Sequence, residues 1–302
     1  MASKALTFYA RFAPSFTRIG YLARGLPLRP AARSLAGQSW LVTGATGGIG
    51  RAVALGAARR GACVIAVGRN AEKLQALAGE NAGRIETIER DLSLVAENLS
   101  LAAEVGPIDV LINNVGNLPP DHHLTAEGFE QSYATSLLGQ FALTEALLDQ
   151  GKLDGGAIVN MASGGMYNAP LDTGLLDLPA DRYNGFLAYA ANKRAQLALA
   201  DHWASRADAY TMHPGWVATQ GVSDALPWMD RWIGPLLRSP AQGADTALWL
   251  ASKRPKHREG RIWFDRAARK AHHYDLTRNP RSSIEDVVAK LRADVAKVEN
   301  AQ

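Results

Sequence analysis

The sequence predicts an α/β fold in which helices cover both faces of a doubly wound parallel sheet. Short β-branched runs alternate with helix-patterned segments along the chain, which is typical of a parallel sheet. These runs are almost continuously apolar, as strands buried on both faces must be. The predicted strands are 39–44, 63–68, 84–89, 108–114, 156–163, 209–215 and 261–265.

The 302 residues are enough for one large domain or two smaller ones, and the unbroken alternation favours a single domain. We expect a basic amphipathic arm at 1–37, the α/β domain at 38–268 and a C-terminal extension at 269–302. In the extension, Ser282 and Glu285 have the spacing of a capping box before an apolar stripe. This helix packs on the domain or on a partner subunit. The stripe consists of Ile284, Val287, Val288, Leu291, Val295 and Val298.

Composition and charge describe a globular protein with a basic N-terminal part. Hydrophobic residues make up 47% and charged residues 21%, which excludes a disordered chain. The net charge is +4, and no Asp or Glu precedes Glu72. Such a distribution suits an anionic ligand or a membrane surface. No interleaving of aromatic and basic residues favours nucleic acid over a phosphate cofactor, so we expect no nucleic-acid partner.

The N-terminal arm is open to three interpretations. Leu6, Tyr9, Phe12, Phe16 and Ile19 have near-helical spacing, with arginines between them and Pro14 as an interruption. The arm is a helix packed on the domain, a membrane-surface anchor or a transit peptide. No segment has the apolar length that spans a bilayer. We expect a cytoplasmic protein, with peripheral membrane contact through the arm as an open alternative.

The single cysteine, Cys63, excludes an internal disulfide and fits a reducing compartment. Because it stands in the apolar run 63–68, we expect it to be buried and structural.

A glycine-rich turn, "TGATGGIG", joins the first predicted strand to the first helix. Glycines at this junction allow a tight turn, a close approach of the backbone to a pyrophosphate and close packing of helix on strand. The phosphates then lie at the positive end of the helix. The pattern indicates a Rossmann-type dinucleotide site, with cofactor contacts from Gly44, Thr46, Gly48, Ile49 and Gly50.

The end of the second strand indicates which cofactor is bound. Rossmann domains that prefer NAD place an acid here for the ribose 2′-hydroxyl, whereas an arginine accommodates a 2′-phosphate. Arg69 stands at this position, and Arg51 follows the glycine turn. Since a guanidinium binds phosphate through parallel hydrogen bonds, we expect NADP(H) rather than NAD(H).

Together with this turn, "NNVG" at 113–116, Ser163 at a strand end and the Tyr189-x-x-x-Lys193 spacing resemble the short-chain dehydrogenase/reductase superfamily. The resemblance covers residues 38–265. The segments "SGGM", "NKRAQ" and "MHPGW" are most similar to the branch named dehydrogenase/reductase family member 12. The resemblance implies an oxidoreductase that acts on a small carbonyl or alcohol, and a homo-oligomer.

The resemblance also implies the roles of the catalytic residues. Tyr189 exchanges a proton with the substrate oxygen, and Ser163 holds that oxygen. A free phenol has a pKa of about 10, and a nearby cation lowers it. At i and i+4 of a helix, Lys193 shares a face with Tyr189 and supplies this charge. We therefore expect Lys193 to tune Tyr189 as the general acid or base.

One position departs from the family. Where the superfamily places an asparagine in the fourth helix, alignment through Gly139 places Ser136. In the family this residue lends its backbone carbonyl to a water that links the lysine to solvent. Serine keeps a carbonyl, so we expect activity with altered proton delivery.

Further cofactor contacts are implied at the ends of later strands. Asp91 matches the position that meets the adenine, and Asn113 and Gly116 match the turn beside the ribose. The segment after the sixth strand covers the nicotinamide. The full set is Asp91, Leu92, Asn113, Gly116, Tyr189, Lys193, Pro214, Gly215, Val217 and Thr219.

Two segments are candidates for the substrate wall. Residues 164–185 separate Ser163 from Tyr189 by more residues than is usual in the family. Residues 216–240 contain large apolar side chains, which favour an apolar, lipid-like substrate or else pack on the domain or a subunit. These are Trp216, Leu226, Trp228, Trp232 and Leu236.

No histidine cluster has metal-ligand spacing, so no metal is expected, and His213 is assigned a structural hydrogen bond. The leading hypothesis is an NADP(H)-dependent oxidoreductase acting on a carbonyl or alcohol. The alternative is a nucleotide-binding regulatory or scaffold protein whose catalysis has been lost.

Overall fold

A computed structural model describes residues 12–32, 34–81, 83–225, 231 and 233–301. In this part of the chain an 8-stranded sheet has the order β3-β2-β1-β4-β5-β6-β7-β8. All neighbouring strands are parallel except β7 and β8. The strands are β1 Ser39–Thr43, β2 Cys63–Gly68, β3 Ile85–Glu89, β4 Val110–Asn113, β5 Ala157–Met161, β6 Asp208–Met212, β7 Arg261–Phe264 and β8 Ala267–Lys270.

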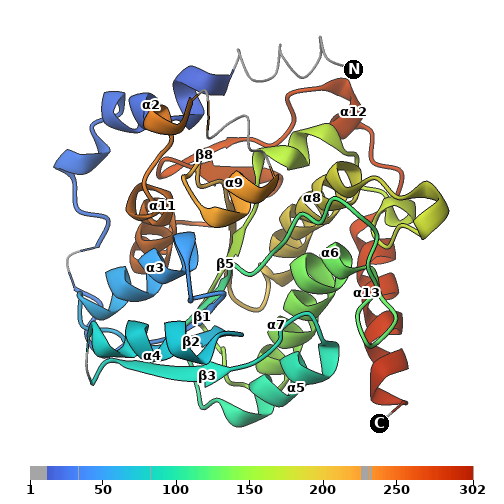
Figure 1. Cartoon of the computed structure of the whole chain (residues 1–302), viewed down its shortest axis with the longest axis horizontal. Coiled ribbons are helices and arrows are strands. Elements are labelled where there is room, and N and C mark those ends of the chain that lie inside the picture. Colours follow the sequence, from blue (N-terminus) through green and yellow to red (C-terminus); the bar gives the residue numbers. More distant parts are fainter. Residues whose placement is uncertain (1–11, 33, 82, 226–230, 232, 302) are drawn as a thin grey trace.

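The sheet separates two hydrophobic cores, and helices lie over each (Figure 1). In β1, Leu41 joins one core while Trp40 and Val42 join the other, because successive strand residues point to opposite faces. This confirms the doubly wound α/β fold. Over one face lie α3 Gly48–Ala58, α4 Ala71–Gly79 and α11 Pro240–Lys253; over the other lie α5 Val95–Glu104, α7 Gly139–Asp149 and α8 Gly185–Trp203.

The order in which the chain adds strands to the sheet reverses between β1 and β4. Strands β2 and β3 lie on one side of β1, whereas β4, β5, β6 and β7 lie on the other side. Ligands of open α/β sheets bind at such a switch point, beyond the carboxyl ends of the strands. Short helices follow these ends: α6 Gln131–Tyr133, η2 Ala134–Leu138, η3 Gly164–Asn168, η4 Thr173–Leu175, η5 Ala180–Arg182, α9 Gln220–Ala225 and η6 Gly234–Leu236.

The structure corrects two expectations about strands. Cys63 is exposed, because it is the first residue of β2, before the strand enters the core. The antiparallel strand β8 was not predicted from the sequence. Its residues, Ala-Ala-Arg-Lys, have no apolar run, and it lies at the edge of the sheet with both ends partly or fully exposed.

The described part of the N-terminal arm packs on the domain. A helical segment over 12–16 is followed by α2 Arg18–Ala23 and η1 Leu26–Leu28. The break falls at Thr17, the extended N-cap of α2, and not at Pro14. Phe12 and Phe16 are buried. Leu6 and Tyr9, which continue the predicted near-helical spacing, lie outside the described residues.

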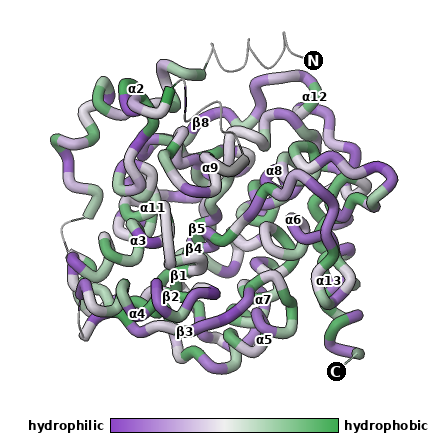
Figure 2. Tube along the Cα trace, in the orientation of Figure 1, coloured by the Kyte–Doolittle hydropathy of each residue, from purple (hydrophilic) through white to green (hydrophobic). Residues whose placement is uncertain are grey.

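The C-terminal extension contains α12 Asp275–Arg278 and α13 Ile284–Glu299. Helix α13 lies against α5, α7 and α8 of its own chain, which confirms packing on the domain (Figure 1). Its capping box is formed by Ser283 and Asp286, one residue later than expected. Hydrophobic and hydrophilic residues alternate along this helix (Figure 2), as its amphipathic pattern predicts.

A buried polar contact fixes α13. The Tyr133 hydroxyl donates to Asp294 Oδ2 at 2.8 Å, and Lys290 and Lys297 pair with the same carboxylate.

Among the described residues, no helix has both the length and the apolar character needed to cross a membrane.

Candidate active site

The glycine turn between β1 and α3 is shaped by Asn114, which follows β4. Asn114 Nδ2 donates to the carbonyl oxygens of Thr43 at 2.9 Å and Gly44 at 3.3 Å. Gly44 has a φ of +64°, where side chains are strained. At Gly50 a Cβ would overlap the Gly44 carbonyl and the Asn114 amide. Two of the predicted glycines are therefore required by the packing of this turn.

The N-terminus of α3 has the features of a phosphate site. Its N-cap, Gly47, makes no side-chain capping bond, and no acidic residue occurs in the first turn. The free N–H groups and the helix dipole therefore attract an anion. Thr219 lies over the turn, since a Cβ on Gly48 would meet its methyl group at 3.0 Å. These residues fit the pyrophosphate of a dinucleotide.

The ends of β2 and β3 form the next part of the site. Gly68 abuts Thr46, and the Arg69 side chain is 68% exposed, with its Nη1 3.9 Å from Asp91 Oδ1. At this separation an exposed pair is weak, so the guanidinium is available to another anion. Arg51 instead pairs with Glu80.

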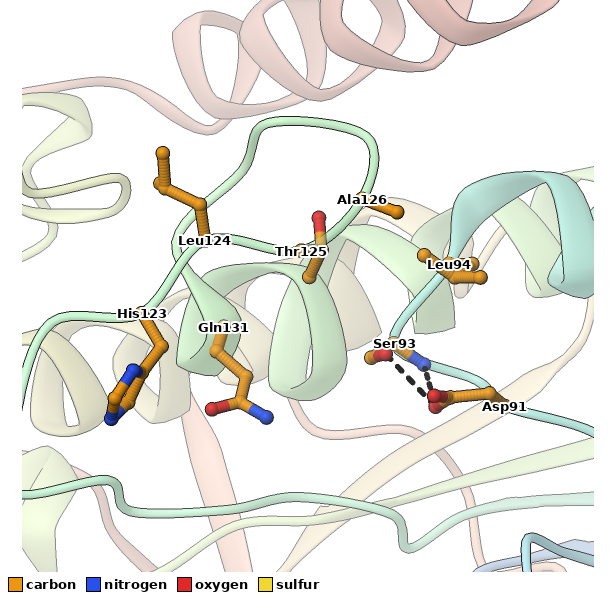
Figure 3. A pocket seen from close by; sticks show the side chains of 8 residues that line it. All are labelled: Asp91, Ser93, Leu94, His123, Leu124, Thr125, Ala126 and Gln131. Carbon is orange, nitrogen blue, oxygen red and sulfur yellow. Dashed lines mark hydrogen bonds between the residues drawn. The ribbon is translucent and has the colours of Figure 1, made fainter.

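Beside Asp91 lies a cavity of about 520 Å³ (Figure 3). Asp91 accepts hydrogen bonds from the N–H and the hydroxyl of Ser93, and His123 and Gln131 lie across the cavity. None of the predicted catalytic side chains lines it. Asp91 is the one residue of its lining that the sequence analysis assigned to the cofactor.

Ser163, Tyr189 and Lys193 are brought together where β5 ends and α8 passes. Ser163 is the N-cap of η3 and is hydrogen-bonded to Tyr189. Lys193 Nζ lies 5.7 Å from the centroid of the Tyr189 ring and donates to the Met161 carbonyl at 2.8 Å. The spacing of these residues in α8 thus places the ammonium beside the phenol.

Burial dominates the ionisation of both groups. It raises the pKa of Tyr189, and the hydrogen bond from Ser163 only partly offsets this. Burial also lowers the pKa of Lys193 to about 7. The expected lowering of the Tyr189 pKa by Lys193 is absent from the protein alone, because desolvation of the phenolate outweighs other effects.

Ser136 lies in the π-helical turn η2, fully buried. Its carbonyl accepts a hydrogen bond from Gln196 Nε2 at 2.7 Å. Gln196 Nε2 also donates to Gln140 Oε1 at 2.5 Å, and Gln140 Nε2 donates to the Val115 carbonyl. The carbonyl that the family offers to a water is therefore engaged by a side chain.

Several predicted contact residues point into the protein. Leu92 is buried in a hydrophobic cluster. Val217 is buried beside Gly243, and Ile49 also packs near Gly243. Asn113 donates to Thr144 and Asn160. The side chains of Leu92, Asn113 and Val217 are thus buried, whereas Gly116 is exposed.

The segment after β6 is held by a buried arginine. Gly215 has a φ of +83° and packs on Arg238. A side chain at Gly215 is excluded, because its Cβ would overlap the guanidinium of Arg238. The Pro214 carbonyl accepts from Arg238 Nη1 at 3.4 Å. His213 Nδ1 accepts from the Gly215 N–H at 2.7 Å, which is the structural hydrogen bond expected for this histidine.

The expected apolar substrate wall is only partly described. Trp216 is buried against Phe16 of the arm, with ring centroids 5.7 Å apart, so it packs on the domain. Leu236 is 40% exposed in η6. Leu226, Trp228 and Trp232 lie outside the described residues.

Sequence reasoning missed Asn114, Gln196 and Arg238. The doublet "NNVG" contained a signal for the first, because an amide beside a glycine turn can bridge its carbonyls. The role of Arg238 was harder to predict, since its side chain binds only atoms of residues that are distant from it in the sequence. Within the described ranges, no group of three or more His, Cys, Asp or Glu residues could hold a metal ion.

Comparison with known proteins agrees with this geometry. The family model for short chain dehydrogenases matches residues 38–230. Human dehydrogenase/reductase SDR family member 12 is 34% identical over 283 residues, covering 87% of this chain and 88% of that protein. The chain belongs to the short-chain dehydrogenase/reductase family.

Other members of the short-chain dehydrogenase/reductase family are similar over shorter spans. Human retinol dehydrogenase 11 is 32% identical over 235 residues, covering 72% of this chain and 73% of that one. A short-chain dehydrogenase from Escherichia coli CFT073, solved with NADPH, has a TM-score of 0.61 and 26% identity. The match covers 79% of this chain and 100% of that structure. The chain thus has the fold and family of nicotinamide-dependent oxidoreductases.

Proposed function

We propose that the protein is an NADP(H)-dependent oxidoreductase that interconverts a carbonyl and an alcohol. The observation that carries this is the convergence of Ser163, Tyr189 and Lys193 beyond the carboxyl end of β5. When bound, the nicotinamide cofactor supplies or accepts the hydride. The protein binds it, orients the substrate and moves the proton.

Cofactor binding is assigned to the ends of β1, β2 and β3. The uncapped N-terminus of α3 holds the pyrophosphate, and Arg69 holds the 2′-phosphate. Fluorescence titration with NADPH and NADH tests this choice. We expect wild type to prefer NADPH by at least about tenfold and Arg69→Ala to lose most of that preference. Equal affinities of wild type for the two cofactors contradict the assignment.

In reduction, Ser163 Oγ and Tyr189 Oη hold the substrate oxygen, and Tyr189 gives its proton to that oxygen as the alcohol forms. In oxidation the same phenol oxygen takes the proton back. The raised pKa of Tyr189 keeps the phenol protonated at neutral pH, which favours reduction. Turnover of Tyr189→Phe and wild type on a panel of aldehydes and methyl ketones tests this role.

The same experiment tests the scaffold alternative. We expect Tyr189→Phe to lower kcat by about 100-fold or more while NADPH still binds. If wild type and variant are equally inert and both bind NADPH, the protein is a nucleotide-binding scaffold instead.

The substrate is proposed to be apolar, and chain length is the variable that tests it. Leu236 and the apolar residues of 216–240 are the basis of this proposal. Methyl ketones of four to twelve carbons measure the apolar contribution. We expect kcat/KM to rise with chain length, by up to about fourfold for each methylene that is fully buried. A flat series contradicts an apolar pocket.

The arm is proposed to contact a membrane surface peripherally. Ile19, Leu22 and Leu28 are 51%, 48% and 87% exposed, beside the exposed Arg18 and Arg29. Apolar side chains flanked by arginines bind anionic interfaces. Cosedimentation with vesicles containing phosphatidylserine tests this, with Leu22→Glu expected to weaken binding. Leu276→Glu, at a residue 50% exposed in α12, is the matched control.

A homo-oligomer is also proposed, with one restriction from the fold. Because α13 covers parts of α5, α7 and α8, these parts cannot pair with a second copy while α13 is docked. Size-exclusion chromatography with light scattering measures the assembly directly, and a monomer at all accessible concentrations contradicts this proposal.

A further inference from the structure

Residues 213–219, here called the crossing segment, run from the end of β6 to the glycine turn before α3. The side chain of Thr219 lies over that turn, and Val217 and Ile49 of α3 both lie against Gly243. Because the segment passes this close to the N-terminus of α3, its position decides how much room a pyrophosphate has at the helix N–H groups.

Main-chain hydrogen bonds join the crossing segment to two distant parts of the chain. The Trp216 carbonyl accepts from the Arg238 N–H at 2.8 Å, and the Arg238 carbonyl accepts from the Ala218 N–H at 2.9 Å. The Trp216 N–H donates to the carbonyl of Phe16, in the arm, at 2.9 Å. The arm is therefore bonded directly to the segment that passes over the glycine turn.

The side chain of Phe16 adds to this bond. It is 4% exposed, and its ring centroid lies 4.4 Å from that of His213, 5.7 Å from that of Trp216 and 5.2 Å from that of Phe264. The Phe16 carbonyl also accepts from Arg238 Nε at 2.9 Å. One arm residue thus contacts the crossing segment through both its ring and its carbonyl, and loss of the ring leaves a cavity beside His213 and Trp216.

The arm in turn depends on the groups that hold the crossing segment. In α2, Ile19 and Leu22 are exposed, whereas the buried Tyr21 has its ring centroid 5.4 Å from the guanidinium carbon of Arg238. Arg238 Nη2 donates to the Ser15 carbonyl at 3.0 Å. Because Arg238 holds both the arm and the crossing segment, neither is displaced without weakening the contacts of the other.

We propose that Phe16 is a positioning residue of the dinucleotide site, and that docking of the arm and binding of NADP(H) strengthen each other through the crossing segment. The proposal rests on the proposed cofactor binding at the N-terminus of α3. Coupling of this kind is reciprocal: a docked arm tightens NADPH binding by the same factor by which bound NADPH tightens docking of the arm. The arm is then a part of the cofactor site and not only a contact to a membrane.

Fluorescence titration with NADPH tests the effect of the arm on the cofactor. We expect Phe16→Ala to raise the Kd of NADPH about tenfold. Phe16→Leu keeps most of the buried apolar volume, so its Kd stays within about threefold of wild type.

Leu77→Ala is the matched control for these variants. Leu77 is 0% exposed in the last turn of α4 and belongs to a different hydrophobic cluster from Phe16. This variant lowers the Tm as Phe16→Ala does, because it also empties a buried site, but it keeps the wild-type Kd. A wild-type Kd in Phe16→Ala, or an equal rise in Leu77→Ala, overturns the proposal.

Limited proteolysis of the wild type tests the effect of the cofactor on the arm and needs no variant. Trypsin cleaves after Arg18 and Arg24 when the arm undocks, at a rate that follows the undocked population. We expect saturating NADPH to slow these cleavages about tenfold. Cleavage after Arg258, which is exposed in the loop before β7, is the internal control and stays unchanged. Arm cleavage that NADPH does not slow, or slowing that is equal at Arg258, contradicts the coupling.

The two proposals fail in different ways. If wild type and Phe16→Ala bind NADPH equally and NADPH does not protect the arm, only the coupling fails and the dinucleotide site stands. If wild type binds no NADPH at all, the proposed function fails, and this inference fails with it.

Discussion

Arg238 and Asp265 form a two-pronged ion pair, with Nη1–Oδ1 and Nη2–Oδ2 distances of 2.6 and 2.9 Å, and both side chains are 1% exposed. The same guanidinium donates to the carbonyls of Ser15 and Phe16 in the arm. Arg24 of the arm joins the Asp265 carboxylate at 2.7 Å. The pair therefore fastens the arm to the segment that follows β6.

Asp265→Asn removes the negative charge from this network. Two guanidinium groups then remain in or near the interior without a carboxylate, which costs about 3–5 kcal/mol. We expect the arm to be released, with faster tryptic cleavage at Arg18 and Arg24 and a lower Tm. Asp275→Asn is the control, because Asp275 is 87% exposed and pairs with Arg278 at the surface. Equal cleavage rates in the two variants contradict this account.

Gly50→Ala tests the shape of the glycine turn. The added Cβ would overlap the Gly44 carbonyl and the Asn114 amide, both of which are fixed. We expect the Kd of NADPH to rise by about 100-fold or more, because the turn must open and the first turn of α3 moves. Gly79→Ala, at the last residue of α4 and away from the turn, is the matched control, because a Cβ there meets nothing within 4 Å. Fluorescence titration measures the Kd of NADPH for both variants, and an equal loss of affinity in the two contradicts the overlap argument.

Lys193→Met tests how far the buried ammonium destabilises the fold. Its pKa is about 7 when folded and 10.5 in a model peptide, so between these values the unfolded chain binds more protons. Stability therefore rises with pH across that window, and the full penalty applies below pH 7. We expect the variant to be more stable at pH 6 by about 2–4 kcal/mol, after loss of the bond to Met161.

This advantage shrinks as the pH approaches 10, and chemical denaturation at several pH values measures it. Lys256→Met, at an exposed lysine, is the control and is expected to change stability little at any pH. A pH-independent gain in Lys193→Met contradicts the assignment to the ammonium.

His213 makes the fold sensitive to acid. Burial, and then the nearby Arg238, lowers its pKa to about 3 from 6.5. Between these values the unfolded chain binds more protons, so stability falls as the pH drops through this window. In His213→Asn the amide oxygen can accept from the Gly215 N–H without titrating. We expect its stability, relative to wild type, to improve steadily from pH 6.5 to pH 4, in contrast to the exposed control His123→Asn.

Local patterns carried the fold prediction. Seven strands, the helices between them and the amphipathic α13 follow from apolar runs and helical periodicity, which depend on neighbouring residues only. The ends differ by one to a few residues, as at Ser283, because caps depend on which side chain reaches the backbone. Strand β8 carries no apolar run and could not be found in this way.

By itself, the sequence determined the α/β architecture, the glycine turn and the Tyr189–Lys193 spacing, since each is set by residues close together in the chain. Tertiary structure decided which distant groups meet: Asn114 with Gly44, Gln196 with the Ser136 carbonyl, and Arg238 with the arm. It also decided the ionisation of Tyr189 and Lys193, because desolvation depends on everything packed around a group and not on its neighbours in sequence.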